Sequence, residues 1–183
     1  MQHTLQTEQW IPRRIDEVFL FFADPNNLPR LMPRWQRARI ESSSLVPPPM
    51  TRSSLLPSDD IANRLRTTLA GSGSTLTISF RPLPMSPVRI SWHALIRDFT
   101  WNSHFCDEQL HGPFRSWLHC HHVRAERRNG VDGTLVTDRL SYSLPGRFLG
   151  DLADALAGAR QIQAVFRHRQ RCLAQIFPAP PAA

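Results

Sequence analysis

Apolar residues occupy every second position from Val88 to Ile96, with polar residues at 89, 91, 93 and 97, and this alternation limits the folds open to the chain. The apolar series is Val88, Ile90, Trp92, Ala94 and Ile96. A period of two places successive side chains on opposite faces of a strand, so one face of the predicted sheet is buried. Similar segments separated by turn residues predict an antiparallel meander. Its strands are expected within residues 64–69, 75–80, 88–97, 103–111, 114–124 and 132–142.

The N-terminal part of the chain predicts one strand followed by two short helices. Residues 3–11 form the strand, Ile15 to Phe22 the first helix and Leu28 to Met32 the second. A further strand is expected at 35–41. Residues 42–63 are rich in serine and proline and predict a loop insertion or lid, which is long for a compact domain.

The last segment has a helical period. Apolar residues recur every three or four positions from Leu149 to Phe177, and Pro178 ends the segment. Arg160, Arg167 and Arg171 fall on the opposite, solvated side. A curved antiparallel sheet that buries its concave face against this helix is an α+β fold, and it encloses a cavity where the helix does not fill the space.

Composition places few further limits on the chain. With 183 residues and 41% hydrophobic residues, it predicts a single domain over 1–177 and a disordered tail over 178–183. The sequence contains no membrane-length apolar stretch and no secretory signal, so we expect a cytoplasmic monomer or homodimer. The odd number of cysteines, three, predicts reduced thiols.

The net charge of +7 comes entirely from arginine, because the chain has no lysine. The arginines are scattered, and the densest groups are residues 34–39, 124–128 and 160–171. Solvated faces explain these groups better than a nucleic-acid surface does, so no specific nucleic acid is expected as a partner.

Three stretches of the chain carry a resemblance to a known superfamily. They lie at residues 11–28, at 105–121 (beginning FCDEQLHGPF) and at 133–138 (GTLVTD) with Tyr142, Pro145 and Gly150. Together with the order of elements, they resemble a bacterial ligand-binding branch of the START-like superfamily, also called SRPBCC or polyketide-cyclase/dehydrase-like. The resemblance implies a helix-grip fold whose cavity binds lipids, quinones or polyketides. No catalytic motif of that branch carries over onto residues of this chain.

A register for the last hairpin follows if Asn129 and Gly130 form a two-residue turn, because Arg128 then faces Val131. The facing pairs are then Trp117 with Tyr142, His119 with Leu140, and His121 with Asp138.

If Gly112–Pro113 is also a two-residue turn, Glu108 faces Trp117, Cys106 faces His119 and His104 faces His121. One sheet face then carries His104, Cys106, Glu108, Trp117, His119, His121, Asp138 and Tyr142. A register shifted by one would replace Glu108 with Asp107 and Gln109.

Several interpretations of this cluster remain open. It could line the cavity as polar groups that orient an apolar ligand, or perform general acid/base chemistry through a histidine and a carboxylate. It could hold a metal through the two imidazoles with Cys106 or Asp138. It could also be an exposed face, or histidines that only hydrogen-bond among themselves.

We expect the chain to bind a small hydrophobic or amphipathic ligand, without a cofactor or a metal, since the metal-ligand set is incomplete. The ligand-binding candidates are Glu108, Trp117, His119, His121, Asp138, Tyr142, Trp92 and Phe166. The first alternative is a cyclase or dehydratase that uses His119 or His121 with Asp138 or Glu108. The second is an RNA- or protein-interaction module that uses the basic surface.

Overall fold

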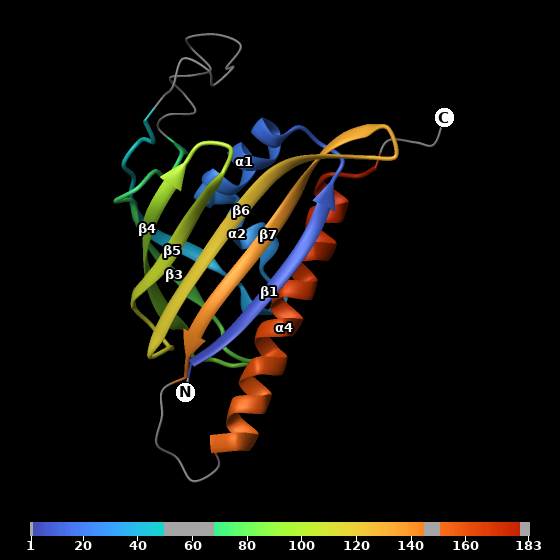
Figure 1. The fold of residues 1–183 in the computed structure, drawn as a ribbon. Helices are drawn as coiled ribbons and strands as arrows, with labels where there is room; N and C mark the ends of the chain where they lie inside the picture. Colours follow the sequence, from blue (N-terminus) through green and yellow to red (C-terminus); the bar gives the residue numbers. More distant parts are fainter. Residues whose placement is uncertain (1, 50–67, 145–150, 180–183) are drawn as a thin grey trace.

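Seven antiparallel strands form one curved sheet in the computed structural model (Figure 1). The structure describes residues 2–49, 68–144 and 151–179, with the side chains of the last segment described from Gly158 onward. The strands are β1 (Gln2–Ile11), β2 (Arg39–Ser44), β3 (Thr75–Phe80), β4 (Ile90–Thr100), β5 (His104–His111), β6 (Ser116–Arg128) and β7 (Val131–Ser143). The helices are α1 (Ile15–Ala23), α2 (Leu28–Leu31) and α4 (Asp151–Ile176), with short 3₁₀ turns at Pro25–Asn27 and Arg34–Gln36.

The strand order in the sheet is β1-β7-β6-β5-β4-β3-β2. Strands β2 to β7 therefore form the expected meander, and β1 pairs with the outer edge of β7. This arrangement with two short helices after the first strand and a long C-terminal helix is the expected α+β helix-grip fold.

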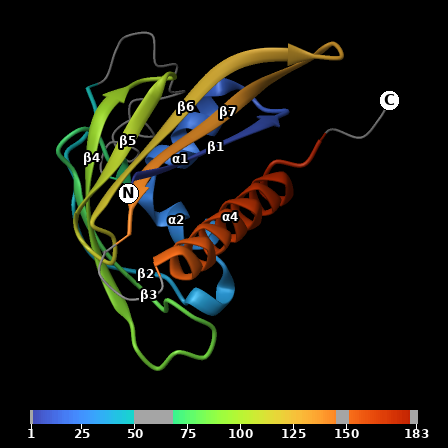
Figure 2. The same cartoon turned by 60° about the horizontal axis from the view of Figure 1, so that its bottom comes forward.

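Helix α4 lies across the concave side of the sheet, and α1 and α2 lie on the same side (Figure 2). Ile162, Phe166 and Leu173 of α4 are buried, at spacings of four and seven residues that keep them on one helix face. Arg160, Arg167 and Arg171 are exposed on the other face, as predicted. At 26 residues, α4 is about 39 Å long.

The apolar core is divided between the two ends of α4. One cluster forms around Phe19 of α1, which is fully buried and meets Phe99, Trp101 and Phe105 edge-on or tilted. The other forms around Trp117, Leu140, Tyr142, Ile162 and Phe166. The space between helix and sheet is therefore packed at both ends, and the cavity lies between them.

Two sequence predictions need correction near the second strand. Residues 34–36 form a 3₁₀ turn and the strand begins only at Arg39, because Pro33 starts the turn and Arg37 ends it with a left-handed backbone, φ 46°. Residues 42–44, which were assigned to the insertion, complete β2. The rest of the predicted lid from residue 50, residues 64–67 of the strand expected at 64–69 and the tail from residue 180 lie outside the described residues. The last two residues of that expected strand, 68 and 69, are described and do not belong to a strand.

The two hairpin registers had different outcomes. The β6–β7 register is confirmed, with His121 opposite Asp138 and Trp117 opposite Tyr142. The β5–β6 register is wrong by one residue, since His119 faces Asp107 rather than Cys106. β5 ends at His111 and β6 begins at Ser116, so the connection is longer than two residues and the pairing shifts. Within it, the side chain of Gln109 bonds both the N–H and the carbonyl oxygen of Phe114.

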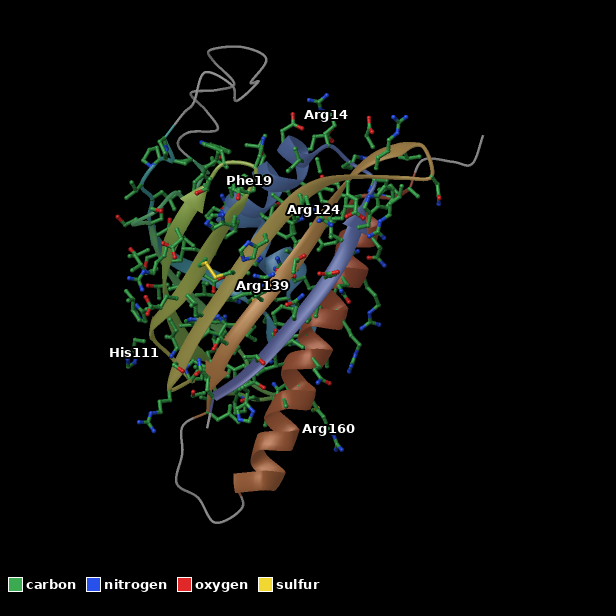
Figure 3. The ribbon with its side chains drawn as sticks, in the orientation of Figure 1. Arg14, Phe19, His111, Arg124, Arg139 and Arg160 are labelled. Atoms are coloured by element: carbon green, nitrogen blue, oxygen red, sulfur yellow. A yellow bond between two sulfur atoms is a disulfide. The ribbon has the colours of Figure 1, made fainter. Side chains whose placement is uncertain are left out.

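The same shift overturns the expectation that all cysteines are reduced. Cys106 faces Cys120 across the two strands, and the pair forms a disulfide that is visible as a yellow bond on the sheet in Figure 3. Cys172 is free. Across the described part of the chain, no helix has the length and apolar character needed to cross a membrane.

Candidate functional site

A cavity of about 150 Å³ lies between the sheet, α1, α2 and α4. Most of its wall is apolar, and the main apolar side chains are Phe22, Leu28, Leu31, Leu76, Ile78, Trp92, Ala94, Ile96, Phe105, Trp117, Val165 and Phe166. An apolar cavity of roughly this volume holds a benzene-sized ring.

One part of the wall is charged, and we call it the polar corner. It consists of Asp107 on β5, His119 and His121 on β6, Asp138 on β7 and Arg169 on α4. The three strands are adjacent in the sheet, and these strand residues all face the concave side. Asp107, His119, His121 and Arg169 line the cavity itself, whereas Asp138 lies behind them.

Asp138 holds both histidines through one carboxylate oxygen. Its Oδ1 is 2.7 Å from Nδ1 of His121 and 3.1 Å from Nε2 of His119. Both imidazoles and the carboxylate are buried, so these hydrogen bonds fix the orientation of each ring in a site shielded from water.

Asp107 contacts the remaining ring nitrogens of the same histidines. Its Oδ1 is 3.4 Å from Nδ1 of His119 and 3.3 Å from Nε2 of His121. Its Oδ2 accepts a hydrogen bond of 3.1 Å from the indole nitrogen of Trp117. Each imidazole is therefore placed between two carboxylates.

Arg169 on α4 contributes a positive charge to the polar corner. Its Nε is 3.2 Å from Oδ2 of Asp138, and one terminal nitrogen is 3.0 Å from Nδ1 of His121. The guanidinium also stacks over Phe22 at 4.8 Å from the ring centroid. This residue is only 7% exposed, which corrects the sequence-based assignment of the 160–171 arginines to a solvated face.

Aromatic rings lock the two imidazoles in place. Phe22 stacks on His121 at 5.7 Å, and Phe105 lies 4.6 Å from the same ring. Phe166 meets His119 edge-on at 5.1 Å. The side chains that bound the cavity therefore also prevent the histidines from rotating away from their carboxylates.

The pKa directions follow from these neighbours. Burial raises the pKa of Asp138, but the Arg169 guanidinium and the two imidazoles lower it well below its usual value. Burial also raises the pKa of Asp107, but His119 and His121 lower it below the usual range. Burial lowers the pKa of His119, yet Asp107 and then Asp138 raise it above its ordinary value. The corner is thus arranged to keep charges of both signs.

The structure brings most of the predicted site residues together. Trp92, Trp117, His119, His121 and Phe166 line the cavity.

The remaining predicted site residues have three different positions. Asp138 lies directly behind the histidines, and Tyr142 packs beside Trp117 with ring centroids 6.3 Å apart. Glu108 does not line the cavity. It lies on the other sheet face in an ion pair with Arg97, because the β5–β6 register differs by one residue.

The sequence did not clearly predict two residues of the polar corner, Asp107 and Arg169. Asp107 was expected in the site only if the register shifted. Arg169 was counted with the exposed arginines, although it falls three residues after Phe166 and four before Leu173, on the buried face of the helix. Its position in that apolar series was the signal that could have revealed it.

No family model matches the chain, and no curated protein matches it by sequence. Solved structures do match, over nearly the whole chain. TTHA0849 from Thermus thermophilus matches with a TM-score of 0.56 at 12% identity, covering 95% of this chain and 99% of that one. A START superfamily protein from Mycobacterium smegmatis matches with a TM-score of 0.53 at 12% identity, covering 95% and 99%.

A third similar structure is an enzyme. A norcoclaurine synthase point mutant from Thalictrum, in complex with a transition-state analogue, matches with a TM-score of 0.51 at 14% identity and covers 96% of each chain. These likenesses show that the chain has the helix-grip fold of START-like proteins, as the sequence resemblance implied.

Proposed function

We propose that the protein binds a small hydrophobic or amphipathic molecule in the cavity between the sheet and α4. The observation that carries this proposal is a largely apolar cavity whose charged groups are confined to one corner. Such a site accepts an apolar body and orients it through a few polar contacts. The helix-grip fold of the matched START superfamily protein supports the same assignment.

The volume favours one kind of ligand among those that the sequence suggested. A quinone or polyketide-like ring matches a cavity of about 150 Å³, whereas a long acyl chain would extend beyond it. Trp92 and Trp117 meet edge-on with ring centroids 4.9 Å apart and form an aromatic wall against which a ring can pack. We therefore propose a ligand of one or two rings with a polar substituent facing the corner.

A cavity-filling variant tests the proposal. Ala94 lines the cavity and is 3% exposed, so Ala94→Phe places a ring in the ligand space, and Ala94→Leu fills it partly. Calorimetric titration with 2-naphthol should show saturable binding to the wild type, at least ten-fold weaker binding to Ala94→Phe and an intermediate value for Ala94→Leu. Ala125→Phe, at an exposed position on β6, is the matched control and should bind normally.

Palmitic acid separates the ring from the acyl chain in the same assay. The proposal expects no saturable palmitate binding. Equal affinity of the Ala94 variants and the wild type for 2-naphthol, with unfolding transitions intact, would contradict the proposed site.

The polar corner favours a second candidate, a dehydratase or cyclase that uses the same cavity. His119 lines the cavity, and its neighbouring carboxylates raise its pKa. It therefore stays protonated up to a higher pH than a free histidine does. Such a group can protonate a departing hydroxyl.

His119→Gln distinguishes turnover from binding. With turnover, the variant purified from the natural host should retain a molecule heavier by one water than the molecule carried by the wild type. With binding alone, both proteins should carry the same mass.

A further inference from the structure

Three side chains of the polar corner, Asp107, His119 and His121, each direct one possible metal-ligand atom toward the others. His119 directs Nε2, and His121 directs Nδ1, at Oδ1 of Asp138. In the tautomer in which those nitrogens donate to Asp138, the lone pairs lie on Nδ1 of His119 and Nε2 of His121. The Arg169 nitrogen that lies 3.0 Å from Nδ1 of His121 then donates to Oδ1 of Asp138, at 3.4 Å, and not to the imidazole. Both lone pairs then face the Oδ1 atom of Asp107.

These converging atoms have the spacing of ligands around a metal ion. Zinc ligands at about 2.0–2.1 Å from the metal in a tetrahedral site lie roughly 3.3 Å from one another. The Asp107 oxygen lies 3.4 Å from Nδ1 of His119 and 3.3 Å from Nε2 of His121. All three donor atoms lie within 4.8 Å of one another. Charge-assisted hydrogen bonds are shorter, about 2.7–2.9 Å, as the His121–Asp138 contact is.

The groups behind the three donors have the arrangement that supports metal ligands in proteins. A histidine that binds a metal usually donates its other N–H to a carboxylate, which fixes the ring and its tautomer. In the tautomer given above, Asp138 accepts such a hydrogen bond from both histidines, and Arg169 in turn forms an ion pair with Asp138. Trp117 fixes Oδ2 of Asp107 and leaves Oδ1 directed at the imidazoles.

Charge and access also favour a cation. The two carboxylates outnumber the single guanidinium, so the corner is negative by one charge when both imidazoles are neutral. The three donors line the cavity, so a fourth coordination position would open toward a ligand bound there. Sites with three protein ligands and one open position are typical of catalytic rather than structural zinc.

We propose that Asp107 Oδ1, His119 Nδ1 and His121 Nε2 bind a divalent transition-metal ion, most suitably Zn²⁺. The expectation of no metal rested on an incomplete ligand set, and the observed β5–β6 register completes the set with Asp107 in place of Cys106. This site goes beyond the proposed ligand binding, because an apolar molecule can occupy the cavity without an ion.

Metal titration of chelator-treated protein without an affinity tag tests the site. Co²⁺ alone should bind with one ion per chain, give the visible absorption of a tetrahedral nitrogen and oxygen site, and be displaced by Zn²⁺. Asp107→Asn should weaken Co²⁺ binding by at least ten-fold. Asp107 is the least buried of the three ligands, with 19% side-chain exposure, so this variant is the one best suited to remain folded.

Two matched controls exclude other histidines and the free thiol. His104 and His122 stack on the opposite sheet face at 5.4 Å, so the double variant His104→Gln/His122→Gln should bind Co²⁺ as the wild type does. Cys172 lies 3.2 Å from Nε2 of His168, and Cys172→Ser should also leave binding unchanged. Loss of binding in either control would overturn the proposal.

A measurement on the wild type keeps the test independent of any variant. On addition of Zn²⁺, ¹⁵N spectra of the imidazoles should show coordination through Nδ1 of His119 and Nε2 of His121, which are opposite ring nitrogens. Coordination through other nitrogens, or no binding at micromolar Zn²⁺, would contradict the site. The 2-naphthol titration of the metal-free protein is a separate measurement, so failure of the metal site does not decide the ligand-binding proposal.

Discussion

Both faces of the β5–β6 hairpin carry a pair of histidines, but the two faces have different chemistry. On the concave face, Asp107, His119 and His121 lie beneath α1 and α4 and join Asp138 and Arg169. On the convex face, the Cys106–Cys120 disulfide lies beside the stacked pair His104 and His122. Strand alternation separates the two sets by a single residue step.

The histidines on the two faces show what decides their charge. Burial lowers the pKa of both His119 and His122. Asp107 and Asp138 reverse that effect for His119, whereas Arg139 and His104 add to it for His122. The neighbouring carboxylates therefore outweigh burial for His119, whereas burial and the neighbouring positive groups act in the same direction for His122. On the concave face, each imidazole contacts two carboxylates.

Removal of the carboxylate at the centre of the corner should have the largest effect. Asp138→Asn leaves the buried Arg169 guanidinium without its anionic partner, and we expect a loss of about 3–5 kcal/mol in the free energy of unfolding. Urea denaturation measures it. Asp132→Asn makes the same chemical change at an exposed position of β7 and should cost less than about 0.5 kcal/mol. Similar losses in both variants would contradict the special role of the corner.

Loss of Arg169, the residue that α4 contributes to the polar corner, should lower the free energy of unfolding nearly as much as loss of Asp138. Arg169→Gln removes the guanidinium beside Asp138 and should lower the free energy of unfolding by about 3 kcal/mol. Arg167→Gln, two residues earlier on the exposed face of α4, should change it by less than about 0.5 kcal/mol. Thermal unfolding of both variants under the same conditions measures the difference. An equal loss of stability in Arg167→Gln and Arg169→Gln would contradict the prediction.

The disulfide is the corresponding test of the convex face. Its two cysteines are 14 residues apart, and closure of a loop of that size stabilises a protein by about 3 kcal/mol at most. We expect Cys106→Ser/Cys120→Ser to cost about 2–3 kcal/mol and to leave 2-naphthol affinity unchanged, because the pair faces away from the cavity. Weaker ligand binding in the folded variant would show that the two faces are coupled.

The smallest effect should be a difference in pH dependence in the metal-free protein. Because the pKa of His119 is raised on folding, its stabilisation is complete below its unfolded value near 6.5 and is lost as pH rises through the folded value. The pKa of His122 is lowered, so protonation disfavours the folded state as pH falls below the unfolded value. Imidazole NMR titration should therefore find His119 above and His122 below the ordinary histidine pKa.

The periodicity and the turn residues of the sequence were sufficient to predict the architecture and the part of the site on β4, β6 and β7. A two-residue Asn129–Gly130 turn has one register, so the pairing of His121 with Asp138 followed from the turn residues alone. Alternation from Ile90 to Ile96 gave the cavity-facing side of β4. Both patterns depend on neighbours in the chain, which a sequence displays directly.

The rest of the site depended on contacts between distant residues. The length of the β5–β6 connection determines whether Asp107 or Glu108 faces inward, and the Gln109 side chain bonds Phe114 within that connection. Arg169 is stable in the core only because Asp138 on another element neutralises it. Without that partner in view, an arginine in a basic helix was more reasonably assigned to the surface.

Native mass spectrometry of the protein purified from its natural host tests the central claim most directly. The account predicts a bound, ring-containing molecule on the wild type that is absent from Ala94→Phe and present on Ala125→Phe. The same molecule bound equally to the wild type and Ala94→Phe would place the binding site elsewhere and contradict the account.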